Sequence, residues 1–253
     1  MLGKLMKYEL KATGRVLLPL YGAILLVSVL GAFSLERMSE FEMGALLFVL
    51  VYTGLCVALV VLTLVLIIQR FNRNLLKDEG YLMFTLPVSV HSLLFSKLFS
   101  ALLWCVLGGC VGLLSIALMT MIAMDASQWG EFWAVIHQLI HNVDLEIAGN
   151  LGLIGLLALM EGVSFLMTIY LSLSVGQIPT FNRYRGLMAF ITFLAITVIM
   201  SWLTGIPAFL HAGDVSAFSP QAMVGLYILY DVVVSALFYG GTWLILTKKL
   251  NLE

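Results

Sequence analysis

One stretch of this sequence, residues 44–68, constrains the fold more than any other. It reads GALLFVLVYTGLCVALVVLTLVLII and contains no charged residue. A helix needs about 20 mostly apolar residues to cross the hydrocarbon core of a bilayer. Because that core offers no hydrogen-bond partners, a segment exposed to it must satisfy its backbone groups internally. We therefore predict that residues 44–68 cross a membrane as an α-helix.

Five further stretches meet the same requirement of length and apolarity. The six predicted spans are residues 16–35, 44–68, 98–124, 151–176, 187–209 and 220–246. The composition agrees, because only 11% of the residues are charged, whereas a soluble domain carries about 25%. We expect an all-α integral membrane protein with six transmembrane helices, built as a single transmembrane domain over residues 1–253.

The basic residues predict the orientation of the chain. Of its 13 Lys and Arg residues, only Arg37 falls on one side of the predicted spans. The others fall on the opposite side: Lys4, Lys7, Lys11, Arg15, Arg70, Arg73, Lys77, Lys97, Arg183, Arg185, Lys248 and Lys249. Cytoplasmic loops carry the excess of Lys and Arg. We therefore predict a multi-pass protein of the cell membrane with both termini in the cytoplasm.

Two amphipathic segments are expected beside the spans. In residues 1–15, leucine and methionine side chains share one helical arc and lysines share another, which is typical of an interfacial helix on an anionic leaflet. The second segment lies outside, between spans 3 and 4. Its apolar residues recur at spacings of three and four: Trp129, Phe132, Trp133, Ile136, Leu139, Ile140 and Val143. This external helix is expected to lie on the membrane or to cap a cavity.

The longest cytoplasmic segment connects spans 2 and 3. Apolar residues alternate there with charged ones, which indicates a short helix half-buried against another body in the cytoplasm. The apolar residues are Leu75, Leu76, Tyr81, Leu82, Phe84 and Leu86. Gly80 can end or bend this helix, and Pro87 cannot continue it. Ser89 can then cap the next helix.

This segment resembles the permease subunits of ABC-2 type transporters of Gram-positive bacteria. The matching strings are Lys77-Asp78-Glu79-Gly80-Tyr81-Leu82, Thr85-Leu86-Pro87-Val88 and Ser96-Lys97-Leu98. The start MLGKLMKYELKATGR, the end KKLNLE and Gly176-Gln177 after span 4 are also similar to that family. The length and the six-span topology agree along the whole chain.

The resemblance implies a coupling helix that docks on a separate ABC ATPase subunit. Its implied residues are Leu75, Leu76, Asp78, Glu79, Gly80, Tyr81, Leu82 and Phe84. It also implies a dimer of permeases, with either a second copy or a paralogue as partner. ATP and magnesium would bind the partner ATPase, and the exported substrate would be an antimicrobial peptide, a drug or a lipid.

The sequence favours a transport subunit over an enzyme. It contains no Gly-x-x-x-x-Gly-Lys-Ser/Thr motif, so no P-loop binds nucleotide on this chain. All four histidines lie outside the predicted spans, which leaves no histidine base or zinc ligand at membrane depth. His137, His141 and Asp144 do share one stripe of the external helix, but polar residues belong beside its apolar face, and we expect no metal. No cofactor on this chain and no nucleic-acid partner are expected.

Two acids, Glu161 and Asp231, fall inside spans 4 and 6. With the spans beginning at 151 and 220, each acid lies about 15 Å from the external end of its helix. One interpretation is a polar lining for the path of a cationic substrate. The other is a neutral acid that is hydrogen-bonded to a local hydroxyl between helices. The candidate hydroxyls are those of Tyr227, Tyr230, Ser164 and Thr168.

Two other functions remain open at this point. A membrane sensor or scaffold for an external ligand would use the large acidic segment 125–150. An ion-coupled secondary transporter would use Glu161 and Asp231 and would need no ATPase. The identity of a co-purifying partner separates these alternatives from an ABC permease.

Overall fold

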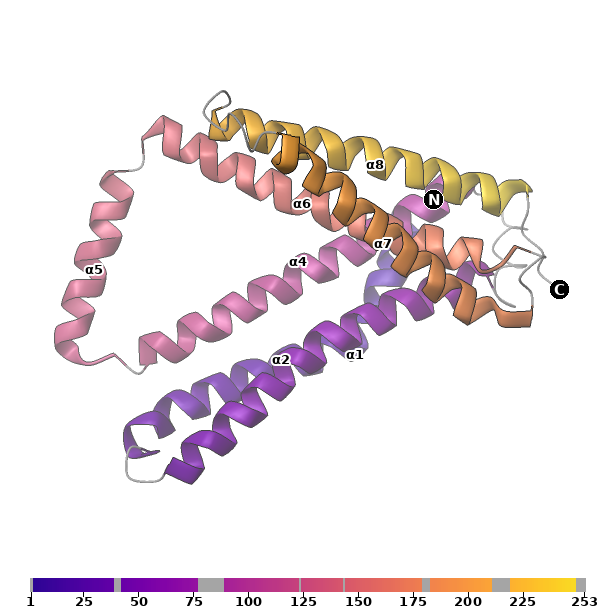
Figure 1. Ribbon diagram of the computed structural model, residues 1–253. Coiled ribbons are helices and arrows are strands. Elements are labelled where there is room, and N and C mark those ends of the chain that lie inside the picture. Colours follow the sequence, from indigo (N-terminus) through magenta and orange to yellow (C-terminus); the bar gives the residue numbers. More distant parts are fainter. Residues whose placement is uncertain are drawn as a thin grey trace. The chain divides into compact units, whose positions relative to one another are not determined.

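The computed structural model describes residues 2–38, 42–76, 89–122, 124–142, 144–178, 183–210 and 219–248. Within these ranges every regular element is a helix (Figure 1). The elements are α1 (Leu2–Met38), α2 (Glu42–Phe71), the π-helical turn η1 (Asn72–Leu76), α4 (Val90–Ile122), α5 (Ala126–His141), α6 (Leu145–Val175), α7 (Arg185–Leu210) and α8 (Pro220–Lys248). The prediction of an all-α protein is confirmed for the described part of the chain.

Six of these helices are long and apolar enough to cross a membrane. Among the described residues, the spanning segments are Leu5–Ala32, Leu46–Phe71, Val90–Ile122, Leu145–Val175, Arg185–Thr204 and Pro220–Lys248. Each predicted span overlaps one of them, so the prediction of six helices that are long and apolar enough to span is confirmed. Three spans begin six or more residues earlier than predicted, at Leu5, Val90 and Leu145 in place of residues 16, 98 and 151, because a helix continues beyond its most apolar part until a cap or a turn stops it.

The first helix differs from the prediction near its N-terminal end. We expected an interfacial helix over residues 1–15 followed by a turn into a span at residue 16, but α1 runs unbroken from Leu2 to Met38. Pro19 lies inside α1, where it removes one backbone hydrogen bond without ending the helix. The basic segment and the first span are therefore one element, and the placement of that segment on a membrane surface stays a prediction.

Two spanning helices begin at a serine cap. At α4, the Ser92 N–H donates to Ser89 Oγ at 3.3 Å, which confirms the predicted cap at Ser89. At α8, the Ala222 N–H donates to Ser219 Oγ at 3.3 Å. Pro220 follows as the first residue of α8, where its missing N–H costs no helical hydrogen bond.

The external segment forms the separate helix α5. It begins after Asp125, whose N–H donates to Gln128 Oε1 at 2.9 Å, and it ends at His141. A helix is present over these residues, whereas its role as an amphipathic helix outside the membrane stays a prediction. The rings of His137 and His141 lie 4.6 Å apart, but no group of three metal-binding side chains gathers in the part of the chain that the structure describes.

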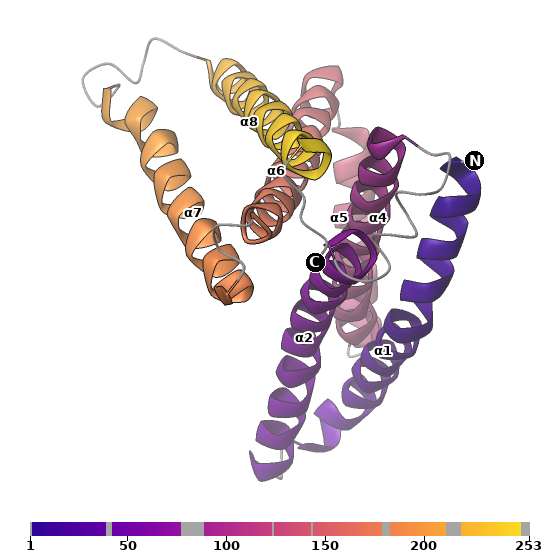
Figure 2. The same ribbon diagram turned by 90° about the vertical axis from the view of Figure 1, so that its right-hand side faces the viewer.

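The chain divides into two compact units. The N-terminal unit comprises residues 3–67 and 103–144, and the C-terminal unit comprises residues 1–2, 68–102 and 145–253. In the N-terminal unit α1 lies beside α2 (Figure 2). The buried core of this unit consists of Leu17, Tyr21, Ile24, Leu59 and Trp104. These residues come from α1, α2 and the later part of α4, so one apolar cluster joins three spanning helices.

Two side-chain hydrogen bonds link the helices of the N-terminal unit. The Tyr21 hydroxyl of α1 donates to the backbone carbonyl of Trp104 on α4 at 3.1 Å. The hydroxyls of Tyr52 on α2 and Ser115 on α4 lie 2.7 Å apart. Because the Ser115 hydroxyl donates to the Gly112 carbonyl, Tyr52 is the donor in this pair. Polar side chains thus supplement the packing that holds membrane helices together.

In the C-terminal unit α6 packs against both α7 and α8 (Figures 1 and 2). The Phe71 ring at the end of α2 stacks on the Tyr170 ring of α6, with centroids 4.2 Å apart. The helix α6 ends at a close approach, where a Cβ on Gly176 would lie 2.6 Å from the Arg185 carbonyl oxygen at the start of α7. Glycine is therefore required at this close approach between the end of α6 and the start of α7.

Candidate functional site: an acidic pair between α6 and α8

The two intramembrane acids lie on the helices that pack together in the C-terminal unit. Glu161 is near the middle of α6, sixteen residues after Leu145 and fourteen before Val175. Asp231 lies eleven residues after Pro220 in α8, which is about 16 Å along the helix at 1.5 Å per residue. Each acid is therefore well inside the apolar part of its helix.

The structure brings these acids into one polar cluster. The side chains of Asp231 on α8 and Ser164 on α6 lie close enough to interact. Glu161 lies close enough to Asp231 for the two carboxylates to repel each other. Glu161 and Ser164 are three residues apart, so they share one face of α6. The cluster thus comprises two carboxyl groups and one hydroxyl at the interface of two spanning helices.

The surroundings of the cluster favour a positively charged partner. Neither α6 nor α8 contains a Lys or Arg before Lys248. Asp231 and Ser164 are half-buried, whereas Glu161 is exposed. A charged acid facing hydrocarbon costs roughly 2.5–3.5 kcal/mol even on the most lenient scale. Glu161 must therefore face water, a second protein surface or a cationic ligand when it is ionised.

The other predicted hydroxyl partners are engaged elsewhere. The Tyr230 hydroxyl donates to the Met200 sulfur at 2.9 Å, which ties α8 to α7. The Thr168 hydroxyl donates to the Ser164 carbonyl at 2.9 Å within α6, and no hydrogen bond from Tyr227 is recorded among the described residues. Of the four hydroxyls considered from the sequence, Ser164 is the one that the structure brings to an acid. Asp231 is half-buried beside Ser164, and Glu161 is the more accessible carboxylate.

The predicted coupling segment is described only in part. Leu75 and Leu76 form the end of η1, and their side chains are 0% and 1% exposed. The remaining residues of this prediction, Asp78, Glu79, Gly80, Tyr81, Leu82 and Phe84, lie outside the described residues. Since Leu75 and Leu76 are covered by the chain itself, we expect them to anchor the start of the coupling segment. Contact with an ATPase stays a prediction for the residues that follow them.

Sequence reasoning missed the pairing of Glu161 with Asp231. Each acid stands out as a charge within an apolar run, but nothing in either run specifies that α6 packs against α8. A partial signal is the spacing of Glu161, Ser164 and Thr168, which marks one polar stripe on α6. Such a stripe in a spanning helix is expected to face another helix and not lipid.

Comparisons with protein-family models, with curated proteins and with solved structures find no match to this chain.

Proposed function

We propose that this chain is the permease subunit of an ATP-binding-cassette exporter. It forms the membrane pathway together with a second permease and couples to a separate ATPase subunit. Three features support this proposal: six spanning helices, a first cytoplasmic loop that resembles the ABC-2 permeases, and a sequence without a P-loop of its own.

The acidic pair is the observation that carries the transport function. Two carboxyl groups near each other at membrane depth, with no Lys or Arg on α6 or on α8 before Lys248, attract a cation. A substrate with a cationic group, such as a basic peptide or an amphipathic drug, gains an ion pair there that it loses in lipid. Because the site can bind a cation more tightly than the lipid around it does, it can serve as a step on a transport path.

A second permease would shield the exposed acid, Glu161, from lipid. Glu161 is exposed in the single chain, and an ionised carboxylate exposed to lipid is unfavourable. In a permease dimer the path runs between two such chains, so Glu161 faces a hydrated cavity. The identity of the second chain, a copy or a paralogue, follows from which permease species co-purify.

Coupling to the ATPase uses the loop between α2 and α4. Residues 77–88 connect η1 to α4, so a displacement of this loop acts on two spanning helices at once. The buried pair Leu75 and Leu76 fixes one end of the loop, and the Ser89 cap marks the other. Tyr81 and Leu82 are the residues proposed to contact the ATPase.

The transport proposal is tested by neutralising each acid. Glu161→Gln and Asp231→Asn are produced in cells that lack the native gene, and growth is measured against a panel of cationic peptides and drugs. Either substitution should abolish protection that the wild-type chain confers while the protein remains in the membrane at its normal level. Glu146→Gln is the matched control, because Glu146 lies in the first turn of the same helix. Protection by both variants at the wild-type level would contradict the proposal.

An ion-coupled secondary transporter is the second candidate. The presence of two acids, Glu161 and Asp231, inside packed spanning helices favours it, because carboxyl groups at membrane depth can form proton relays. The two functions differ in their source of energy. Transport that stops when an ionophore collapses the proton gradient, at an unchanged ATP level and without an associated ATPase, would support the secondary transporter.

A further inference from the structure

The coupling loop, residues 77–88, is flanked on both sides by aromatic contacts. Phe71 lies six residues before this loop and His91 three residues after it. Both residues belong to the C-terminal unit, together with α6 and α8. Their contacts therefore decide which spanning helices the two ends of the loop are joined to.

Before the loop, the contact is with α6. The Phe71 ring stacks on the Tyr170 ring, with centroids 4.2 Å apart and planes 8° from parallel. Phe71 is 0% exposed and Tyr170 is 1% exposed. Leu75 and Leu76, which follow in η1, are buried as well. This end of the loop is therefore held in the core of the unit against α6.

After the loop, the contact is with α8. His91 Nδ1 is hydrogen-bonded to the Tyr239 hydroxyl at 2.8 Å. The imidazole also stacks on the Tyr239 ring at 5.8 Å and on the Trp243 ring at 5.3 Å, with planes 21° and 15° from parallel. Tyr239 and Trp243 are four residues apart, so they share one face of α8. One side chain in the first turn of α4 thus ties that helix to α8.

The two ends of the loop differ in burial. His91 is exposed, and its partners Tyr239 and Trp243 are half-buried. Contacts at a surface open at a lower cost than contacts in a core. The link to α8 is therefore the adjustable one, whereas the link through Phe71 is fixed.

Both contacts reach the interface of α6 and α8 at the same level. The two helices pack together and run in the same direction (Figure 1). A Cβ on Gly241 would lie 3.1 Å from Leu171 Cδ1. Because Gly241 is two residues after Tyr239 and Leu171 follows Tyr170, the two aromatic contacts lie at matching turns of the neighbouring helices.

The acidic pair lies at a similar distance from each contact. Glu161 precedes Tyr170 by nine residues, and Asp231 precedes Tyr239 by eight. At 1.5 Å per residue, these separations are about 14 Å and 12 Å along the helices. A movement of α8 along α6 at the level of Tyr239 therefore changes the separation of the two acids.

On the basis of the permease function proposed above, we propose that His91 is the positioning residue through which the coupling loop moves α8 relative to α6. The Phe71 stack holds α6, and a displacement of the loop acts on α8 through the imidazole. The result is the small sliding that packed helices undergo. Because the attraction of a cation depends on its distance from each carboxylate, this sliding changes how tightly Glu161 and Asp231 hold a cationic substrate.

The test measures ATP hydrolysis and transport separately. ATP hydrolysis is measured in the complex co-purified with its ATPase, and transport as protection of cells against the panel of cationic peptides and drugs. His91→Ala should keep the ATPase and its hydrolysis rate within about twofold, and should lower protection roughly fivefold or more, as expected when a coupling between two sites is lost. The His91 side chain is exposed, so the fold is expected to survive, and the amount of protein in the membrane checks this.

A double variant separates transmission from simple destabilisation. Tyr239→Phe removes only the hydroxyl and should lower protection less than His91→Ala does. Adding Tyr239→Phe to His91→Ala should cause no further loss, because both changes remove the same hydrogen bond. Losses that multiply in the double variant would overturn the proposal.

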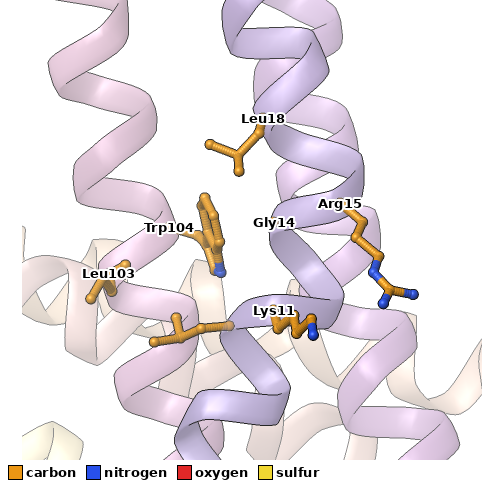
Figure 3. Close-up of a pocket in the computed structure, with 7 residues that line it drawn as sticks. Lys11, Gly14, Arg15, Leu18, Leu103 and Trp104 are labelled. Carbon is orange, nitrogen blue, oxygen red and sulfur yellow. The ribbon is translucent and has the colours of Figure 1, made fainter.

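Two control variants match these changes. Tyr21→Phe also removes one tyrosine bond to α4, to the Trp104 carbonyl at 3.1 Å, but in the N-terminal unit, where the Trp104 indole lies against Gly14 of α1 (Figure 3). Phe95→Ala removes a ring that is 51% exposed, one turn after His91 on α4. Both controls should keep protection within about twofold, below the usual range of coupling between sites. A loss in either control equal to that of His91→Ala would overturn the proposal.

The possible results distinguish a failure of this link from a failure of the permease function. Recovery of the wild-type chain without an ATPase would overturn both. Full protection by His91→Ala with its ATPase bound would overturn the role of His91 alone. Loss of the ATPase from His91→Ala would also overturn that role, because His91 would then hold the binding surface and not transmit its movement.

Discussion

The Ser164 hydroxyl of α6 lies close enough to the Asp231 carboxyl group of α8 to interact with it. This contact crosses the interface of two spanning helices and involves one of the acids, while Glu161, one turn earlier on α6, is exposed. The two acids therefore have different roles in the proposed pathway. Asp231 is positioned by the fold, and Glu161 is free to meet a cation.

Removing the Ser164 hydroxyl should weaken the contact between α6 and α8. We expect Ser164→Ala to lower the free energy of unfolding by about 0.6–1.7 kcal/mol, the range measured for interhelical hydrogen bonds in membranes. Ser201→Ala is a suitable control, because the exposed Ser201 hydroxyl bonds only to the Val198 carbonyl of its own helix. Unfolding in a mixed detergent–SDS titration measures both values. Equal losses for the two variants would argue against the cross-helix bond.

The close approach at Gly176 predicts that a larger side chain at this position lowers the stability of the protein. Gly176→Ala places a Cβ at 2.6 Å from the Arg185 carbonyl oxygen, and we expect a loss of about 1–3 kcal/mol from the resulting overpacking. Gly186→Ala is the matched control, since a Cβ there meets nothing within 4 Å. It should be neutral or raise stability by up to about 1 kcal/mol through helix propensity. Thermal unfolding in detergent, followed by circular dichroism, should rank the two variants in this order.

The bond between Tyr52 and Ser115 can be measured by a double-mutant cycle. Tyr52→Phe, Ser115→Ala and the double variant should show a coupling energy of about 0.5–1.5 kcal/mol, because each single substitution removes the same 2.7 Å hydrogen bond. The pair Tyr21→Phe and Ser115→Ala is the control, since these residues share no hydrogen bond. Strictly additive losses for Tyr52 and Ser115 would mean that α2 and α4 are not joined there.

The sequence was most informative where lipid limits the possible structures. The charge-free run 44–68 had to become a helix, and α2 covers it. The Ser89 cap was predictable for a similar local reason, because Pro87 prevents an earlier start and a serine hydroxyl satisfies a free N–H. These features depend on neighbours in the chain, so no tertiary information is needed to infer them.

Other features depend on tertiary packing and were not predictable. The pairing of Glu161 with Asp231 follows from the contact of α6 with α8, and hydropathy does not specify which spans are neighbours. The break expected near residue 15 is absent: α1 continues unbroken through this region and past Pro19. The complete burial of Leu75 and Leu76 was likewise not expected, since the sequence indicated only a half-buried segment.

Purification of the full-length protein from its native membranes, in mild detergent and followed by mass spectrometry, tests the central proposal most directly. An ABC ATPase should co-purify in a stoichiometric amount with the wild-type chain, and the eluate should hydrolyse ATP. Tyr81→Ala and Leu82→Asp should lose the ATPase while the chain keeps its helical content. Recovery of the chain without any ATPase, or undiminished recovery of the ATPase with both variants, would contradict the proposed permease and its coupling loop.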